Sequence, residues 1–458
     1  MGKQSAPLDG DLQRTYRGRA WRDEEPNRRL LLDTNVEEKA VLIASLNCSA
    51  VEEADRLTEM GELLRTAGAT VVHRVVQHRE RPDPRLYLGK GRLEELAEWV
   101  KEHKPNVVVA EGDLAAGQQR HLEDKLNTRV VDRTGIILDI FALHAKSAEG
   151  KLQVELAQME YSYSRQEGLW QHLERLGGGV GTRGPGESQL ESDRRMIRER
   201  MGLLRKRLQE AAKSRDTMRE ERMASPVTRV ALAGYTNAGK SSLMNALTGA
   251  GVDVNNALFE TLDATTRAFS QDGVKVLVSD TVGFIRHLPH QLVESFRSTL
   301  DEVRDAHLIL HVADASEDDD GREARAKAVV EVLDEIGAGE VPHLHVMNKC
   351  DLLDIEDLDA LRRQYPTAIF TSAISGEGLD ELRDRLLATA RARWDRVVLE
   401  VPYSRGDVIS AIYSAGREVT QEAGPEGTLI RALMPPVDAA RVRALAAKER
   451  QSPYGGPR

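Results

Sequence analysis

The chain has 458 residues, of which 40% are hydrophobic and 30% charged, and its formal net charge is -10. This length indicates about two to four domains, and the composition excludes a disordered chain. The net acidity argues against a generic nucleic-acid coat protein, although a local basic face remains compatible with it. Cys48 and Cys350 are the only cysteines, so we expect no disulfide framework and no cysteine metal site.

Residues 1–38 are polar and rich in arginine. They are predicted to form a mobile tail, with a weak RNA-binding arm as the alternative. No stretch approaches the ~18 apolar residues of a membrane span, and the N-terminus lacks the apolar core of a secretory signal. We therefore expect a cytoplasmic protein without membrane contact.

Strand and helix patterns alternate over residues 39–148. Residues 40–46 and 69–77 have the pattern of strands, and the amphipathic segment between them is predicted to be a helix that ends at Gly68. The alternation predicts a small α/β domain with mostly parallel strands. The loop at 87–96 could hold an anion before a helix, but a plain turn is the favoured interpretation.

Residues 149–224 carry two apolar stripes at heptad spacing. The spacing predicts two helices of about 25 residues that pack as an antiparallel hairpin. The segment between them, 177–187, contains six glycines, which favours a tip that approaches RNA backbone over a plain connector. The stripes are Leu152, Leu156, Met159 and Tyr163, and Ile197, Met201, Leu204, Leu208 and Ala211.

The second arm of this hairpin has a large excess of basic side chains. In an acidic protein, such an excess indicates a phosphate-contacting face and a merely solvated face about equally well. The basic residues are Arg194, Arg195, Arg198, Arg200, Arg205, Lys206, Arg207, Lys213, Arg215, Arg219 and Arg222.

Residues 234–241 match the phosphate-loop pattern G-x-x-x-x-G-K-[ST], between an apolar strand and a helix start. The backbone N–H groups of such a loop surround phosphates. Lys240 can reach the β- and γ-phosphates, and the Ser241 hydroxyl can bind Mg²⁺. ATP and GTP both remain open at this point. The loop residues are Gly234, Tyr235, Thr236, Asn237, Ala238, Gly239, Lys240 and Ser241.

The pattern N-K-x-D follows a further strand, at Asn348, Lys349 and Asp351. A carboxylate can accept hydrogen bonds from guanine N1–H and the 2-amino group, which adenine lacks. An S-A sequence at Ser372 and Ala373, followed by Ile374, is typical of a loop that supports the guanine oxygen. In this order the patterns predict a GTPase, in which GTP or GDP binds with Mg²⁺.

Two switch segments lie between these motifs. The D-x-x-G pattern places Asp280 near Mg²⁺ and the Gly283 N–H at the γ-phosphate, with Thr281 and Val282 between them. Thr261 is the predicted threonine ligand of Mg²⁺. Thr265 and Thr266 are the less favoured alternatives.

Small GTPases have a water-orienting glutamine after this glycine, but this chain has Phe284. An apolar ring cannot orient water, so the sequence predicts slow intrinsic hydrolysis that a partner must complete. Lys240 and Gly283 are the predicted catalytic residues.

With these motifs, the chain resembles the HflX GTPases, a family of ribosome-associated bacterial factors. The resemblance covers about residues 40–395 and includes the run at 130–142 (VVDRTGIILDIFA), and its most specific part is the run at 181–187 (GTRGPGE). It implies binding to the large ribosomal subunit or whole ribosomes in the GTP state, splitting of stalled ribosomes under stress, and stimulation by the ribosome. Among the implied nucleotide contacts are those of the first switch: Phe259, Glu260, Thr261, Leu262 and Asp263.

The resemblance also implies that the glycine-rich tip points toward the peptidyl-transferase region, where the tip and the basic arm would contact ribosomal RNA. Ala264 departs from the proline that family members often have, so the first switch is expected to be more mobile here. An RNA-binding assembly or hibernation factor that does not split ribosomes is the alternative function. Off the ribosome, we expect a monomer.

The predicted fold class is α/β. A phosphate-loop GTPase domain with a mixed, mostly parallel sheet, residues 227–395, follows the small α/β domain and its hairpin. Residues 396–448 are predicted to form a small α+β domain with two strands and two helices, for docking or for stability alone. Residues 449–458 are predicted to be a flexible tail.

Overall fold

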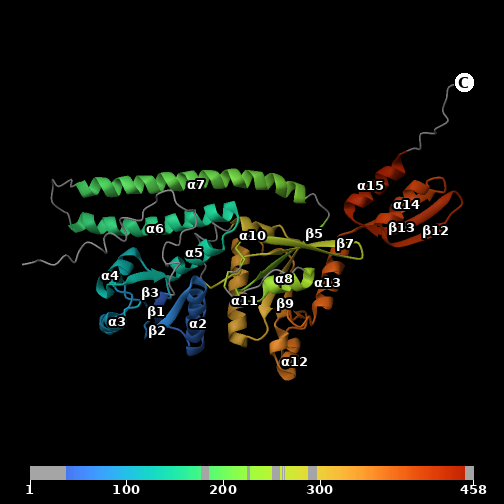
Figure 1. Cartoon of the computed structure of the whole chain (residues 1–458). Helices are drawn as coiled ribbons and strands as arrows, with labels where there is room; N and C mark the ends of the chain where they lie inside the picture. Colours follow the sequence, from blue (N-terminus) through green and yellow to red (C-terminus); the bar gives the residue numbers. More distant parts are fainter. Residues whose placement is uncertain are drawn as a thin grey trace, which may run out of the picture.

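The computed structural model describes most of the chain, and its strands form three separate sheets (Figure 1). The predictions for the two tails fall almost wholly outside the described residues. The described ranges are 38–176, 185–223, 227–249, 258–259, 261–262, 264–286 and 297–448, without the side chains of 166–176, 185–193, 214–223 and 297–299.

The first sheet is parallel throughout and has the order β2-β1-β3-β4. Its helices begin and end where the sequence offers caps. Ser49 accepts the backbone N–H of Glu52 at the start of α2, and Gly68 ends that helix in the left-handed region. The elements are β1 Glu38–Leu46, α2 Ala50–Ala67, β2 Ala69–His78, α3 Lys90–His103, β3 Val107–Ala110, α4 Ala116–Leu126, β4 Arg129–Asp132 and α5 Arg133–His144.

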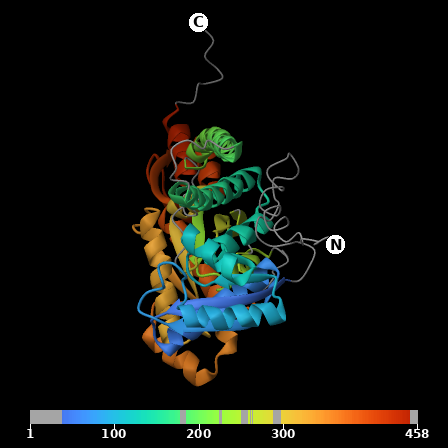
Figure 2. The same cartoon turned by 90° about the vertical axis from the view of Figure 1, so that its left-hand side faces the viewer.

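The predicted hairpin consists of α6, Ala148–Leu176, and α7, Pro185–Met223, which run side by side along one edge of the molecule (Figures 1 and 2). Met159, Ile197, Met201 and Leu204 form its buried cluster, so the heptad prediction is confirmed there. Leu208 and Ala211, in the same predicted stripe, are only half-buried.

The expected arm length of about 25 residues was wrong for α7, which has 39 residues. Pro185, Gly186 and Glu187, which we assigned to the glycine-rich tip, form the start of this helix, because proline's fixed φ suits the first helical position. The rest of the tip, residues 177–184, lies outside the described part of the chain.

The second sheet has six strands in the order β10-β9-β8-β5-β7-β6, and only β6 is antiparallel to its neighbour. This is the mixed, mostly parallel sheet that the motifs predict. Its elements are β5 Thr228–Gly234, α8 Lys240–Thr248, β6 Thr265–Gln271, β7 Val274–Asp280, α10 Arg297–Arg304, β8 Leu308–Asp314, α11 Asp319–Glu335, β9 His343–Asn348, the 3-10 turn η1 Cys350–Leu352, α12 Ile355–Gln364, β10 Ile369–Phe370 and α13 Leu379–Ala392.

The third sheet is antiparallel, with the order β11-β13-β12. The sequence predicted two strands here, and the structure has a third, β12. Its residues are mostly exposed and polar, so the strand has no apolar alternation that could reveal it. The elements are β11 Asp395–Pro402, α14 Gly406–Ala415, β12 Arg417–Ala423, β13 Gly427–Met434 and α15 Pro436–Ala447.

A single apolar cluster joins the first sheet's helices to the second sheet. It contains Phe141 of α5 together with Phe259 and Leu262 of the predicted first switch and Phe284 of the second. The two α/β units therefore share buried surface at the segments that the sequence identifies as switches.

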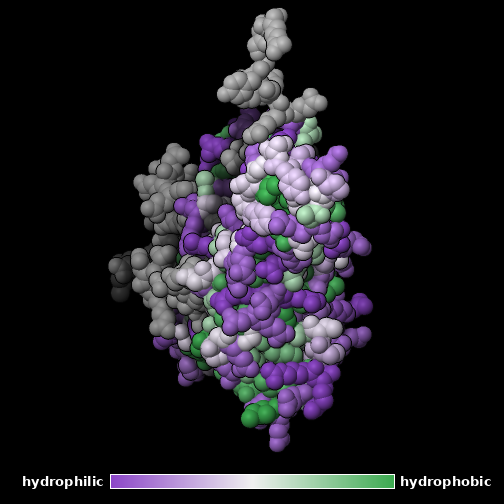
Figure 3. All heavy atoms as spheres, turned by 90° about the vertical axis from the view of Figure 1, so that its right-hand side faces the viewer, coloured by the Kyte–Doolittle hydropathy of each residue, from purple (hydrophilic) through white to green (hydrophobic). Residues whose placement is uncertain are grey.

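The face turned to the viewer in Figure 3 is largely hydrophilic, with scattered hydrophobic spheres. Within the described ranges, no helix is both long and apolar enough to cross a bilayer. Several large apolar side chains are nevertheless exposed near the second sheet, including Leu352, Ile355 and Ile374.

Buried His311 of β8 predicts acid sensitivity. Burial, with His345 and His343 nearby, lowers the pKa of His311 to about 4. As the pH falls from about 6.5 toward 4, the unfolded chain takes up a proton that folded His311 excludes, so folding stability should fall. We expect the melting temperature to drop across this range, and to drop less in His311→Asn.

The control is Gln364→Asn, an exposed position without a titratable group at the end of α12. Its melting temperature should follow the wild-type pH dependence. If His311→Asn showed the same pH dependence as the wild type, the acid sensitivity would not come from the lowered pKa of His311.

Candidate functional site

The phosphate loop joins β5 to α8 through a turn that depends on two glycines. A Cβ on Gly234 would lie 2.2 Å from the Val312 carbonyl oxygen, and a Cβ on Gly239 would lie 2.3 Å from Asn348 Nδ2. Gly239 also has φ 85°, which a side chain disfavours. The loop is thus packed directly against the ends of β8 and β9.

Lys240 is buried inside this loop. Its Nζ donates to the carbonyl oxygens of Gly234 at 3.1 Å and Tyr235 at 2.9 Å. Burial lowers the pKa of Lys240 to about 8, and nearby Asp280 opposes that shift. A Cβ on Gly283 would lie 3.1 Å from Nζ, so the structure brings the two predicted catalytic residues together.

Three oxygen-bearing side chains converge beside the lysine. Ser241 Oγ donates to Asp280 Oδ2 at 2.6 Å, Thr261 Oγ1 donates to the same oxygen at 2.8 Å, and the two hydroxyl oxygens are 3.0 Å apart. Asp280 Oδ1 is buried and has no hydrogen-bond partner among the described residues. Burial raises the pKa of Asp280, while Lys240 and the two hydroxyls oppose the shift.

This donor set fits Mg²⁺, which prefers carboxylate and other hard oxygen ligands. The two alternative threonines begin β6 instead. Thr266 Oγ1 lies 2.8 Å from Ser279 Oγ on the neighbouring strand, and Thr265 pairs with Asp280 in the strand register. Among the hydrogen bonds of the described residues, Thr261 is the only one of these three threonines whose hydroxyl donates to the Asp280 carboxylate.

The other first-switch residues are placed differently. Phe259 and Leu262 are both buried, and the Phe259 ring meets Phe141 of α5 edge-on at 4.7 Å between centroids. Their side chains therefore belong to the shared apolar cluster. Glu260 and Asp263 lie outside the described residues.

The guanine motifs meet at Asn348. Its Nδ2 donates to the Ala238 carbonyl at 2.9 Å, and its Oδ1 accepts the Ala373 N–H at 3.3 Å. The Ser372 hydroxyl oxygen accepts the N–H of Ile374 at 3.2 Å. Asp351 lies exposed on the 3-10 turn η1. One buried amide thus holds the phosphate loop and the S-A loop together.

Sequence reasoning missed Asp314, at the end of β8. Its carboxylate lies 2.6 Å from Lys349 Nζ and also accepts the backbone N–H of Ser316 at 2.9 Å. A strand ending in an acidic residue beside the N-K-x-D strand was the available signal. Asp314 orients the lysine of the guanine motif.

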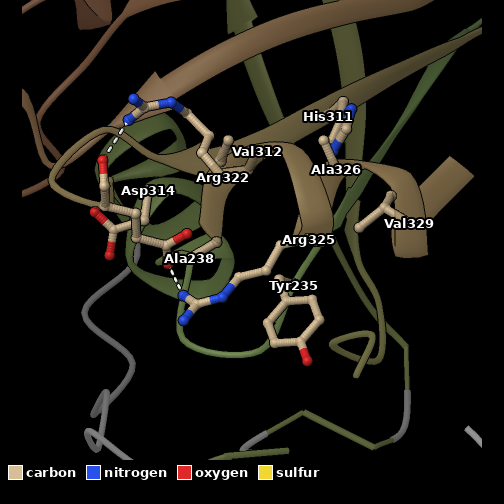
Figure 4. A pocket seen from close by; sticks show the side chains of 11 residues that line it. Tyr235, Ala238, His311, Val312, Asp314, Arg322, Arg325, Ala326 and Val329 are labelled. Carbon is tan, nitrogen blue, oxygen red and sulfur yellow. Dashed lines mark hydrogen bonds and ion pairs between the residues drawn. The ribbon is translucent and has the colours of Figure 1, made fainter. Parts of the chain in front are cut away.

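The Tyr235 side chain points away from the phosphate cradle. It lines a small cavity with His311 and Arg325, whose guanidinium lies 5.3 Å from the ring centroid (Figure 4). The cavity holds about 10 Å³, so it has room for at most a water. Tyr235 thus faces the loop lysine only through its backbone carbonyl, and its hydroxyl donates to Glu59 of α2.

Phe284, in the glutamine position, is 1% exposed and belongs to the apolar cluster. Its backbone N–H donates to Gly234 at 3.1 Å, and its carbonyl accepts the Thr236 N–H at 2.8 Å. The second switch is therefore bonded to the phosphate loop through the backbone, with the phenylalanine ring packed into the core.

Three family models match consecutive parts of the chain. They are a GTP-binding GTPase N-terminal region at 54–142, a GTP-binding GTPase middle region at 144–222 and a 50S ribosome-binding GTPase at 229–349. A protein named GTPase HflX from Lacrimispora saccharolytica is 42% identical over 405 residues, covering 87% of this chain and 94% of that protein. The chain belongs to the GTPase HflX family. The HflX of Escherichia coli K12 is 41% identical over 407 residues, with 88% and 94% covered.

A comparison with solved structures also finds a GTP-binding protein. It is the GTP-binding protein from the archaeon Sulfolobus solfataricus in complex with GDP, 23% identical, covering 78% of this chain and 99% of its own, with a TM-score of 0.41. The family assignment rests on the long HflX matches instead. As a member of that family, the chain is a GTPase with a ribosome-binding type of GTPase domain, and its cofactors are guanine nucleotide and Mg²⁺.

Replacing Asp314 with Asn should weaken guanine nucleotide binding. The change removes the charge of an ion pair that is 25% and 11% exposed at its two side chains, so we expect a loss of about 1 kcal/mol, or about fivefold in Kd for GDP. Fluorescent GDP titration measures this. Asp320→Asn on the exposed start of α11 is the control, and equal Kd values for the two variants would contradict the role.

Replacing Phe284 with Gln should not create a small-GTPase active site. The side chain points into the core, so single-turnover GTP hydrolysis should stay at the wild-type rate. The buried amide should instead lower the free energy of unfolding by about 2–4 kcal/mol, measured by urea denaturation. Hydrolysis about tenfold faster than wild type would mean that this side chain reaches the nucleotide.

Proposed function

We propose that this HflX-family GTPase binds the large ribosomal subunit or whole ribosomes in its GTP state, splits or rescues stalled ribosomes under stress, and leaves after hydrolysis. The proposal places it in the cytoplasm, where ribosomes are. One observation supports the proposal above all. A single buried apolar cluster connects the nucleotide site to the hairpin, whose helix α7 is long and basic.

The chain's own residues supply most of the nucleotide chemistry in this proposal. The Lys240 ammonium neutralises charge on the β- and γ-phosphates, and the Gly283 N–H contacts the γ-phosphate. Ser241, Thr261 and Asp280 hold Mg²⁺, which when bound withdraws charge from the phosphate oxygens. Asp351 selects guanine, since its carboxylate would lack donors opposite adenine.

Intrinsic hydrolysis is proposed to be slow because the residue after Gly283 cannot orient water. The Phe284 backbone is hydrogen-bonded to the phosphate loop, and its ring is buried in the apolar cluster. A group from the ribosome would then have to complete the site, which couples hydrolysis to ribosome contact.

The exposed side of α7 is the proposed contact for ribosomal RNA. Arg200 and Arg205 are already paired with Glu155 and Glu160 of α6, at 2.7 Å each. Other basic residues of this arm remain exposed and could meet phosphates. Those with described, exposed side chains are Arg198, Lys206, Arg207 and Lys213, together with Arg195, which lies 3.8 Å from Glu199.

Sedimentation of whole ribosomes with the protein tests the proposal. With a non-hydrolysable GTP analogue we expect separated subunits, and with GDP intact ribosomes. Bound protein on intact ribosomes with the analogue would instead favour a GTP-gated assembly or hibernation factor.

A charge-matched pair of variants tests the hairpin surface. One variant combines Arg198→Gln, Lys206→Gln and Arg207→Gln, and it should bind ribosomes more weakly. The slope of log K for ribosome binding against log salt concentration should become shallower by up to about 0.7–0.9 per lost phosphate contact. The control neutralises exposed Arg363, Arg385 and Arg396 elsewhere on the chain. Equal loss in both triple variants would contradict a hairpin contact.

A further inference from the structure

The run VVDRTG at 130–135 lies where the first sheet, the hairpin and the GTPase sheet meet. It ends β4 and begins α5, a helix whose residues from Arg133 to Ala142 are all buried. Within this run, the neighbours Asp132 and Arg133 have different partners. Asp132 contacts α6 of the hairpin, and Arg133 contacts the second switch.

Arg133 belongs to a buried polar network beside the phosphate loop. Its Nη2 lies 3.2 Å from Glu59 and donates to the Arg286 carbonyl at 3.0 Å. The Tyr235 hydroxyl donates to Glu59 and accepts the Arg286 N–H at 2.8 Å. The Arg133 and Glu59 side chains are 6% and 11% exposed, so losing one partner would leave a buried charge poorly paired.

Asp132 has a comparable network toward the hairpin. Its carboxylate accepts the Tyr161 hydroxyl at 2.8 Å and the backbone N–H of Leu114 at 3.1 Å, and forms an ion pair with Arg165. The Arg165 guanidinium lies 3.4 Å from the Tyr161 ring centroid. Both Tyr161 and Arg165 lie near the middle of α6, so this part of the hairpin is fixed to the start of α5.

The other end of α5 contacts the first switch. Phe141 packs against Phe259, and α2 adds a hydrogen bond from the Leu258 N–H to the Thr66 hydroxyl at 3.2 Å. Helix α5 is therefore in contact with both switches and the hairpin. A close-packed helix shifts as a unit rather than deforming along its length.

We propose that Asp132 and Arg133 are positioning residues that couple the nucleotide state to the placement of the hairpin. When the γ-phosphate draws Gly283, the Arg286 carbonyl three residues later moves with it. Arg133 must then follow or lose a buried hydrogen bond, and Asp132 carries the shift of α5 to Tyr161 and Arg165. The inference rests on the proposed function only for the use of this movement on the ribosome.

Hydrogen exchange on the full-length chain tests the coupling without ribosomes. Amide exchange of α6 residues 152–163 is compared in the presence of Mg²⁺ with GDP or with a non-hydrolysable GTP analogue. Nucleotide affinity is measured on the same samples. In the wild type we expect exchange rates that differ by at least about fivefold between the two nucleotides.

Two variants remove the coupling at different points. Arg133→Lys keeps the positive charge but cannot span Glu59 and the Arg286 carbonyl with one forked group, and Tyr161→Phe removes only the hydroxyl that donates to Asp132. In both, the difference between nucleotides should fall below about twofold while GDP and the GTP analogue still bind. Arg129→Lys is the matched control, because Arg129 also pairs with a glutamate, Glu38 at 2.6 Å, at the far end of β4.

The outcomes separate the proposals. An α6 difference that persists in Tyr161→Phe and Arg133→Lys, or that is lost equally in Arg129→Lys, would overturn the coupling. So would an absent difference in a wild type that binds both nucleotides, and the GTPase function would then stand. If Arg133→Lys does not fold, the Tyr161→Phe result decides. Failure of the wild type to bind either guanine nucleotide would end both proposals.

Discussion

The apolar contact between α5 and the two switches is the constraint on which the molecule's organisation depends. Phe259 and Phe284 are buried against helices of the first sheet, although in the sequence they belong to nucleotide motifs. A buried aromatic side chain contributes several kcal/mol to stability, so neither ring can leave the core without compensation. Movement of the switches therefore involves the first α/β unit as well as the GTPase sheet.

This constraint explains why the phosphate loop has a tyrosine at its second position. In the structure Tyr235 gives its carbonyl to Lys240 and its hydroxyl to Glu59. One residue therefore belongs to the nucleotide cradle through its backbone and to the interface through its side chain. The same division occurs at Phe284, whose backbone bonds the loop and whose ring fills the core.

The electrostatics of the site follow from burial. Lys240 and Asp280 are both removed from water, which disfavours the charged form of each, and their mutual attraction partly offsets that cost. A triphosphate and Mg²⁺ are the groups that such a pair of buried charges can neutralise. On the hairpin, part of the positive charge is already neutralised within the chain. Because Arg200 and Arg205 pair with glutamates of α6, fewer basic groups are left for a partner than the sequence suggested.

The sequence by itself determined the nucleotide chemistry and the order of elements, because both depend on local patterns. The loop at 234–241 needs glycines at fixed spacing, and the heptad stripe from Leu152 predicted the hairpin. The sequence also favoured Thr261 over Thr265 and Thr266 as the Mg²⁺ ligand, but only the tertiary structure showed that the Thr261 hydroxyl lies at Asp280. Asp314, Glu59 and Arg133 act through residues far away in the chain, and strand β12 has a polar sequence, so no local pattern revealed them. Their roles are decided by which strands and helices pack together, and spacing along the chain does not encode that.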